Sequence, residues 1–202
     1  MLVADISRSC VYFEQAGKHN TDKVIEAVVR RLNVGDIQTV VVSSTTGYTA
    51  RNLSEALQGR TDVTLISVAE SALIREWGTA YPTLKPETKQ DLERRGVIVA
   101  DKVSYVFHNS LFDHSKWKAP TPEETVRETL YAFGQGMKVA IEVVLIAVTS
   151  GYLDPFQEVI AVGGTHRGAD TAIVMNATYP NHIFSQDPAK RLKVHEILCK
   201  PR

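Results

Sequence analysis

The sequence has 202 residues, enough for one large domain or two small ones with a core that needs no disulfide or metal support. Lysine and arginine together number 23, as do aspartate and glutamate, so the formal net charge is zero. A neutral chain without a basic run has no long-range field to attract nucleic acid or an anionic membrane, and we expect neither as a partner.

The cysteines, the N-terminus and the longest apolar run predict a cytoplasmic protein. Cys10 and Cys199 lie near opposite ends, where two reduced thiols are a better interpretation than a disulfide. The first ten residues lack a basic start followed by an apolar core, so we predict no signal peptide. The apolar run at residues 139–148 is too short for a membrane helix, which needs about 20 residues.

Strand-like and helix-like segments alternate through the first half of the chain. Apolar residues recur at helical spacing between residues 24 and 32, after Asn20 or Thr21 as the N-cap. Gly35 and Gly96 mark two of the breaks. The expected order is a strand at 11–13, a helix to 32, a strand at 39–42, a helix at 49–57, a strand at 63–68, a helix at 86–95 and a strand at 97–100.

The second half begins with an irregular, aromatic-rich stretch at residues 104–120. Thr121 then predicts a strong helix start, because Pro122 takes the first helical position and Glu124 closes a capping box. We expect this helix to run to about residue 133, Gly134 and Gly136 to interrupt it, and an almost wholly apolar helix to follow. The remaining elements are that helix at 138–149 and strands at 158–162, 171–175 and 194–198.

This alternation predicts a three-layer α/β/α sandwich around a mostly parallel sheet. There is no internal repeat, low-complexity stretch or linker, so residues 1–202 are interpreted as one domain. Ligands of such folds bind beyond the carboxyl ends of the strands, at a point where the strand order reverses. We expect that point between the strand that ends at Ser43 and the strand at 158–162.

The segment SSTTGYT joins the second strand to a helix and is the strongest candidate for an anion site. A helix N-terminus offers unpaired N–H groups and a partial positive charge, and the hydroxyls add donors. Gly47 lets the backbone approach an anion or adopt a positive φ, and a valine there should block the anion while leaving the fold intact. The alternative is a turn that only caps its own helix. The residues assigned to this site are Ser43, Ser44, Thr45, Thr46, Gly47, Tyr48 and Thr49.

A second loop, within EVIAVGGTHRGADTAIVM, follows the strand at 158–162. Gly163 and Gly164 suggest close approach of a ligand, and Arg167 has the forked shape that clamps a phosphate or carboxylate. Asp170 and Thr171 complete the candidate set. The alternative is a hairpin-like turn with a surface pair between Arg167 and Asp170.

The motifs VVVSSTTGYTAR and VGGTHRGADTAIV together resemble the C-terminal domain of pyruvate kinases, where such a loop binds a sugar-phosphate effector. The chain has no (β/α)₈ barrel before them, so the resemblance implies no kinase chemistry. YFEQAGKHNT, KVAIE and ILCKPR add a closer resemblance to a small stand-alone family of archaeal and bacterial proteins built on that domain. That resemblance implies bound flavin mononucleotide (FMN), with its phosphate in the first loop.

Four more residues are candidates for contact with such a ligand. Glu14 would accept hydrogen bonds from a ribityl chain or ring N–H, and Asn20 and Thr21 would help to bind an anion; the alternative is a well-capped helix start. Glu142 lies in an apolar helix, where an unpartnered carboxylate costs several kcal/mol or becomes protonated. It either contacts the ligand or pairs with Lys138 one turn earlier.

Other chemistry has weaker support. The six histidines show no metal-ligand spacing and no C-x-x-C pair occurs, so no metal site is predicted. No G-x-S-x-G elbow or nucleophile–base set is present, which argues against a hydrolase. Trp77 and Tyr81 would stack on an aromatic ring or pack a loop over the site.

We therefore expect a protein that binds a small phosphorylated ligand, with FMN first and flavin-dependent oxidoreductase activity as one consequence. The alternatives are a non-catalytic effector module for a sugar phosphate, and a phosphate-handling enzyme that uses Glu14, Glu142 and Asp170. The sequence leaves open whether the chain is an enzyme and whether it forms a homo-oligomer.

Overall fold

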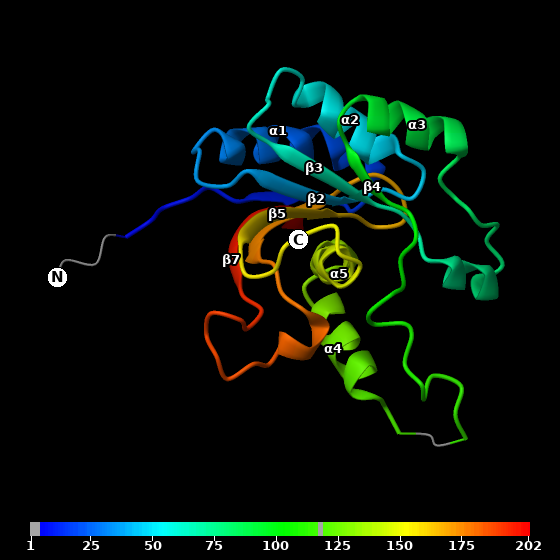
Figure 1. Ribbon diagram of the computed structural model, residues 1–202. Helices are drawn as coiled ribbons and strands as arrows, with labels where there is room; N and C mark the ends of the chain where they lie inside the picture. Colours follow the sequence, from blue (N-terminus) through cyan, green and yellow to red (C-terminus); the bar gives the residue numbers. More distant parts are fainter. Residues whose placement is uncertain (1–4, 117–118) are drawn as a thin grey trace.

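Seven strands form one sheet in the order β1-β7-β6-β5-β2-β3-β4 in the computed structural model, which describes residues 5–116 and 119–202 (Figure 1). The strands are β1 (Val11–Phe13), β2 (Thr39–Ser43), β3 (Thr64–Val68), β4 (Ile98–Ala100), β5 (Glu158–Gly163), β6 (Thr171–Asn176) and β7 (Val194–Pro201). The helices are α1 (Thr21–Leu32), α2 (Tyr48–Ala56), α3 (Pro86–Arg94), α4 (Pro122–Tyr131) and α5 (Gln135–Thr149), with 3₁₀ turns η1 (Lys18–Asn20), η2 (Ala72–Trp77) and η3 (Pro180–His182).

The sheet is mostly parallel, and β6 is its antiparallel member. β2 pairs in parallel with β3 and β5, β3 with β4, and β1 with β7, whereas β6 is antiparallel to both β5 and β7. The two reversals at β6 cancel, so β1 runs in the same direction as β2 and β5. The carboxyl ends of these three strands therefore share one edge of the sheet. The predicted α/β class and mostly parallel sheet are confirmed.

Helices cover both faces of the sheet (Figure 1). Successive residues of a strand point to opposite faces, and β2 shows the division: Val40 and Val42 belong to the core under α1, α2 and α3, while Val41 belongs to the core against α5. Helix α4 packs on α5 through the partly buried Val126 and Leu130. Helix α5 is buried along almost its whole length, which explains its apolar sequence.

Two glycines set the close contact of α5 with the sheet. A Cβ atom on Gly163 would lie 2.3 Å from the carbonyl oxygen of Gly136, and a Cβ on Gly136 would lie 2.2 Å from Thr171 Oγ1. The prediction that Gly136 interrupts the helix was wrong, since α5 begins at Gln135 and includes it. The lack of a side chain at Gly163 allows the backbone of α5 to pack closely there, so the space beside this glycine is not open to a ligand.

Most predicted helix and strand boundaries agree with the structure to within a few residues. The capping box at Thr121 and Glu124 is present in both directions, as predicted. The 3₁₀ turns η1, η2 and η3 were not predicted. Residues 104–116 are irregular, and residues 117 and 118 of the same predicted stretch lie outside the described residues. Among the described residues, no helix combines the length and apolar character that crossing a bilayer requires. Cys10 and Cys199 are free thiols.

Candidate functional site

A cavity of about 1020 Å³ lies at the carboxyl edge of the sheet, between the ends of β2, β3 and β5. Small-molecule sites in proteins typically occupy about 300–1,000 Å³, so the cavity can hold a nucleotide-sized ligand. Predicted site residues that line it are Ser43, Ser44, Thr45, Thr46, Tyr48, Thr49, Glu142, Gly164 and Arg167. Predicted site residues outside its lining are Glu14, Asn20, Thr21, Gly47, Gly163, Asp170 and Thr171.

The loop between β2 and α2 presents unpaired amides to this cavity. Ser44 Oγ accepts a hydrogen bond from the amide of Ala50 at 3.2 Å, so one hydroxyl does cap the helix. In the described part of the chain, the backbone amides of residues 45–49 have no acceptor. Thr45, Thr46, Tyr48 and Thr49, which carry four of these free N–H groups, line the cavity at the N-terminus of α2, the positive end of the helix dipole.

Gly47 lies in this loop at the start of α2 and packs against α3. Its φ is 85°, in the left-handed region, and it is the N-cap of α2. A Cβ on Gly47 would lie 2.4 Å from Thr88 Cγ2 on α3 and 3.2 Å from Leu84 Cδ1. The open side of this glycine therefore faces α3, and the expectation that a valine would block an anion without disturbing the fold was wrong.

The second loop is held by Asp170, which is fully buried. Asp170 Oδ2 accepts hydrogen bonds from the amides of Gly17 (2.9 Å) and Thr165 (3.1 Å), and Oδ1 accepts one from Thr171 Oγ1 (2.9 Å). The proposed surface pair with Arg167 does not form, since Arg167 is exposed and Asp170 is not. Asp170 and Thr171 therefore shape the loop from inside.

The helix start after β1 is also built mainly from internal contacts. Thr21 Oγ1 donates to the carbonyl of Lys18 at 2.7 Å and accepts from the amide of Ala169 at 3.0 Å. Asn20 Nδ2 donates to the carbonyl of Gln15 at 2.7 Å. Glu14 is exposed and lies outside the cavity lining. Asn20 is the N-cap residue of α1, but its side chain makes no capping hydrogen bond. Asn20 and Thr21 therefore tie the helix start to neighbouring loops and do not cap it as the alternative proposed.

Glu142 lies on the cavity wall with both carboxylate oxygens engaged. Oε1 accepts hydrogen bonds from the amides of Val106 (3.2 Å) and Phe107 (2.9 Å), and Oε2 accepts one from the ammonium group of Lys138. Glu142 and Lys138 are both buried. The predicted pair one turn apart is present, but in the protein interior, and it anchors the irregular segment that follows β4.

Trp77, Tyr105 and His108 form an aromatic wall on the lining of the cavity, and sequence patterns had missed Tyr105 and His108. Trp77 and Tyr105 stack with centroids 5.5 Å apart and planes at 21°. His108 meets both rings edge-on, at 5.4 and 5.9 Å. Tyr105 and His108 come from the irregular segment 104–116, which has no periodicity from which their position could be inferred.

Glu70 connects this wall to the phosphate-binding candidate loop. Its Oε1 accepts a hydrogen bond from Thr45 Oγ1 at 2.7 Å, and its Oε2 accepts one from the Tyr105 hydroxyl. Burial and the Glu70 carboxylate raise the pKa of Tyr105 well above its ordinary value, so the phenol stays protonated. Burial, followed by the nearby Lys138 ammonium, lowers the pKa of His108 below its ordinary value of 6.5.

Cationic side chains approach the cavity from two other loops. Lys18 lines it, with Nζ 4.1 Å from the centroid of the Tyr48 ring. Arg167 lines it as well and has no ion-pair partner among the residues that the structure describes. Both line the same cavity as the residues that carry the free amides of α2.

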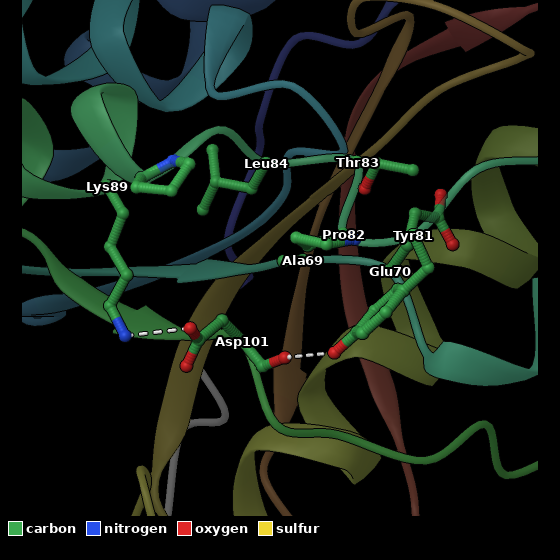
Figure 2. Close-up of a pocket in the computed structure, with 9 residues that line it drawn as sticks. Ala69, Glu70, Tyr81, Pro82, Thr83, Leu84, Lys89 and Asp101 are labelled. Carbon is green, nitrogen blue, oxygen red and sulfur yellow. Dashed lines mark hydrogen bonds and ion pairs between the residues drawn. The ribbon is translucent and has the colours of Figure 1, made fainter.

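A smaller cavity of about 140 Å³ adjoins the large one and shares Glu70 with it. Figure 2 shows that Lys89 Nζ and Asp101 close one side through an ion pair of 2.7 Å. The Tyr81 hydroxyl donates to the Asp101 carbonyl at 3.1 Å (Figure 2). This bond holds Tyr81 at the small cavity, and Tyr81 is not among the residues that line the large one.

Comparison of the chain with models of known protein families finds no match. Within residues 5–116 and 119–202, no group of three or more histidine, cysteine, aspartate or glutamate side chains is arranged to hold a metal ion.

Proposed function

We propose that the protein binds a phosphorylated small molecule in the large cavity, with FMN as the first candidate. The observation that carries this proposal is the row of unpaired amides at residues 45–49, which opens into a cavity of about 1020 Å³. Free amides at a helix N-terminus bind phosphate through several N–H groups at once, and the helix dipole adds to the attraction. The Thr46 and Thr49 hydroxyls lie on the same lining.

Lys18 and Arg167 complete the phosphate subsite. Lys18 comes from the loop after β1 and Arg167 from the loop after β5, at the same edge of the sheet as the N-terminus of α2. An arginine can bind two phosphate oxygens in a fork, whereas a lysine acts as a compact charge. Together they would neutralise the charge of a phosphate monoester.

The rest of the cavity fits a planar ring. Trp77, Tyr105, His108 and Tyr131 line it, and aromatic side chains favour offset or edge contacts with a ligand ring. The apolar Val139, Val143 and Ile146 of α5 form part of the floor. When bound, a flavin would supply the redox chemistry, and the protein would orient it and restrict access of water.

A sugar-phosphate effector is the second candidate, and one observation favours it. Trp77 stacks on Tyr105, so part of each ring face is already covered by protein. A ligand without an aromatic ring would use the same phosphate subsite and leave this stack intact. In that case the protein would be a binding module without its own redox chemistry.

The absorption spectrum of the purified protein tests the first candidate, since bound flavin gives the protein a yellow colour that is released on denaturation. Calorimetric titration with FMN, riboflavin and ribose 5-phosphate then separates the alternatives. FMN should bind at least tenfold more tightly than riboflavin, a difference of about 1.4 kcal/mol. Binding of ribose 5-phosphate alone would favour the effector module, and binding of none of the three compounds would refute the proposal.

Arg167→Ala tests the phosphate subsite. The substitution should lower the affinity for FMN by about tenfold and the affinity for riboflavin by less than about twofold, because riboflavin lacks the phosphate. Arg94→Ala, on the exposed face of α3, is the matched control and should change neither affinity. Equal losses for the two flavins would mean that Arg167 contacts another part of the ligand.

A further inference from the structure

The buried ammonium group of Lys138 has fewer hydrogen-bond partners than it has hydrogens. Lys138 is 4% exposed and lines the large cavity. Of its three N–H groups, one donates to Glu142 Oε2, and no other acceptor is present among the described residues. Phe107 and Tyr131 lie near it, with ring centroids 5.9 and 6.0 Å from Nζ, but rings do not replace two hydrogen bonds.

Such an arrangement is costly without a further acceptor. A charged group removed from water needs its hydrogens paired, because each buried donor left without a partner costs free energy. Glu142 cannot supply a second oxygen, since its Oε1 already accepts the amides of Val106 and Phe107. The spare donors of Lys138 therefore belong to whatever enters the cavity.

The charges around Lys138 restrict what that group can be. Glu142 already balances the Lys138 charge. A second phosphate or carboxylate beside Lys138 would meet the Glu142 carboxylate with only that one ammonium group between them, and like charges in a site of low polarity repel strongly. A neutral carbonyl oxygen or ring nitrogen accepts hydrogen bonds without that repulsion.

We propose that Lys138 forms a second polar subsite of the cavity, which binds the neutral carbonyl or ring-nitrogen edge of a heteroaromatic ligand whose phosphate lies at the α2 N-terminus. This inference rests on the proposed function and deepens it. Tyr131 and His108 line the cavity together with Lys138, and they would flank the ring. The ligand class is then a monophosphate with a conjugated ring, such as a flavin, and sugar bisphosphates are excluded.

Lys138→Met tests the assignment, because it keeps the length of the side chain and removes its donors. FMN affinity should fall at least tenfold, while the affinity for ribose 5-phosphate, which has the phosphate but no aromatic ring, should stay within twofold. Ribose 1,5-bisphosphate should bind the wild-type protein no more tightly than the monophosphate. Lys23→Met, on the exposed face of α1, is the matched control and should change nothing.

If Lys138→Met fails to fold, the double variant Lys138→Met/Glu142→Gln removes the donors and both charges while keeping an acceptor for the amides of Val106 and Phe107, and the same losses are expected. FMN binding that stays within twofold of wild type in these variants would overturn the inference and leave the proposed function standing. A tenfold gain from the second phosphate that Lys138→Met abolishes would also overturn it. Failure of the wild-type protein to bind FMN and both sugar phosphates would refute the proposed function itself, and the inference with it.

Discussion

The carboxylate of Asp170 accepts a hydrogen bond from the backbone amide of Gly17 at 2.9 Å, across 153 positions of sequence. The same carboxylate holds the amide of Thr165 and the hydroxyl of Thr171. The loop after β1, which carries Lys18, is thereby fixed to the β5–β6 loop, which carries Arg167. A buried acid that lies outside the cavity lining thus sets the positions of two cations that line it.

Asp170→Ala should destabilise the protein by roughly 2–4 kcal/mol, because it leaves buried amides without an acceptor. Urea unfolding measures the change. FMN affinity should fall as well, since Lys18 and Arg167 lose their fixed positions. Asp154→Ala, at an exposed position, is the control and should alter stability by less than about 0.5 kcal/mol. A fully stable Asp170→Ala protein that loses only ligand affinity would instead make Asp170 a ligand contact.

Gly47→Ala should destabilise the protein more than Gly59→Ala. Both glycines have a φ of 85°, so alanine at either position costs about 1–2 kcal/mol of backbone strain. A Cβ on Gly47 would also meet Thr88 Cγ2 at 2.4 Å, whereas a Cβ on Gly59 would have nothing within 4 Å. The clash should add about 1–3 kcal/mol, measured as the difference between the two unfolding free energies. Equal losses would show that α3 moves aside without cost.

Two buried serines should respond in opposite ways to substitution by alanine. The Ser67 hydroxyl on β3 is buried without a hydrogen-bond partner among the described residues, so Ser67→Ala should cost nothing or stabilise the protein by up to about 1–2 kcal/mol. Ser44 accepts the amide of Ala50, so Ser44→Ala should cost about 1 kcal/mol. Chemical unfolding of both variants checks the difference. A loss above 1 kcal/mol for Ser67→Ala would reveal a partner that the hydroxyl finds in solution.

His108 should stay neutral at a pH where a free histidine is partly protonated. Burial and Lys138 lower its pKa below 6.5, so the neutral ring stabilises the fold fully above pH 6.5, and this contribution is lost as the pH falls through the folded-state pKa. NMR titration of the ring should show the lowered value, and Lys138→Met should raise it. Wild-type protein should also lose more stability between pH 7.5 and pH 5 than His108→Gln, and an equal loss in both would contradict the assignment.

Local sequence patterns were sufficient for the scaffold. The apolar strands at the centre of the sheet and the capping box at Thr121 and Glu124 depend on residues close in sequence, and both were predicted correctly. The prediction of a mostly parallel sheet did not specify the direction of β6, and the alternative of a hairpin-like turn before it agrees with the antiparallel pairing of β5 and β6. The hydroxyl-rich loop at 43–49 could also be recognised, since a strand, small polar residues and a helix follow one another directly.

The remainder of the site depends on contacts between distant residues. Glu70, Tyr105 and Lys138 meet around one cavity although they belong to three separate segments, and no spacing in the sequence indicates this. The glycines were misinterpreted for the same reason. Gly47 and Gly163 suggested room for a ligand, but the space beside each is filled by α3 or α5. A glycine in a sequence can indicate a close approach by another group, but it does not indicate whether that group is a ligand or another part of the protein.

The contact between Gly136 and Gly163 has a consequence for the depth of the cavity. Lys138 lies half a turn after Gly136 in α5. The distance between α5 and the sheet therefore determines how far the Lys138 ammonium group extends toward a bound ligand. A side chain at Gly136 would clash with Thr171, and one at Gly163 would clash with the backbone of Ala140. Either substitution would push α5 away from the sheet. The lack of a Cβ atom at both glycines therefore sets the distance between α5 and the sheet, and with it the depth of the cavity in which a ring would bind.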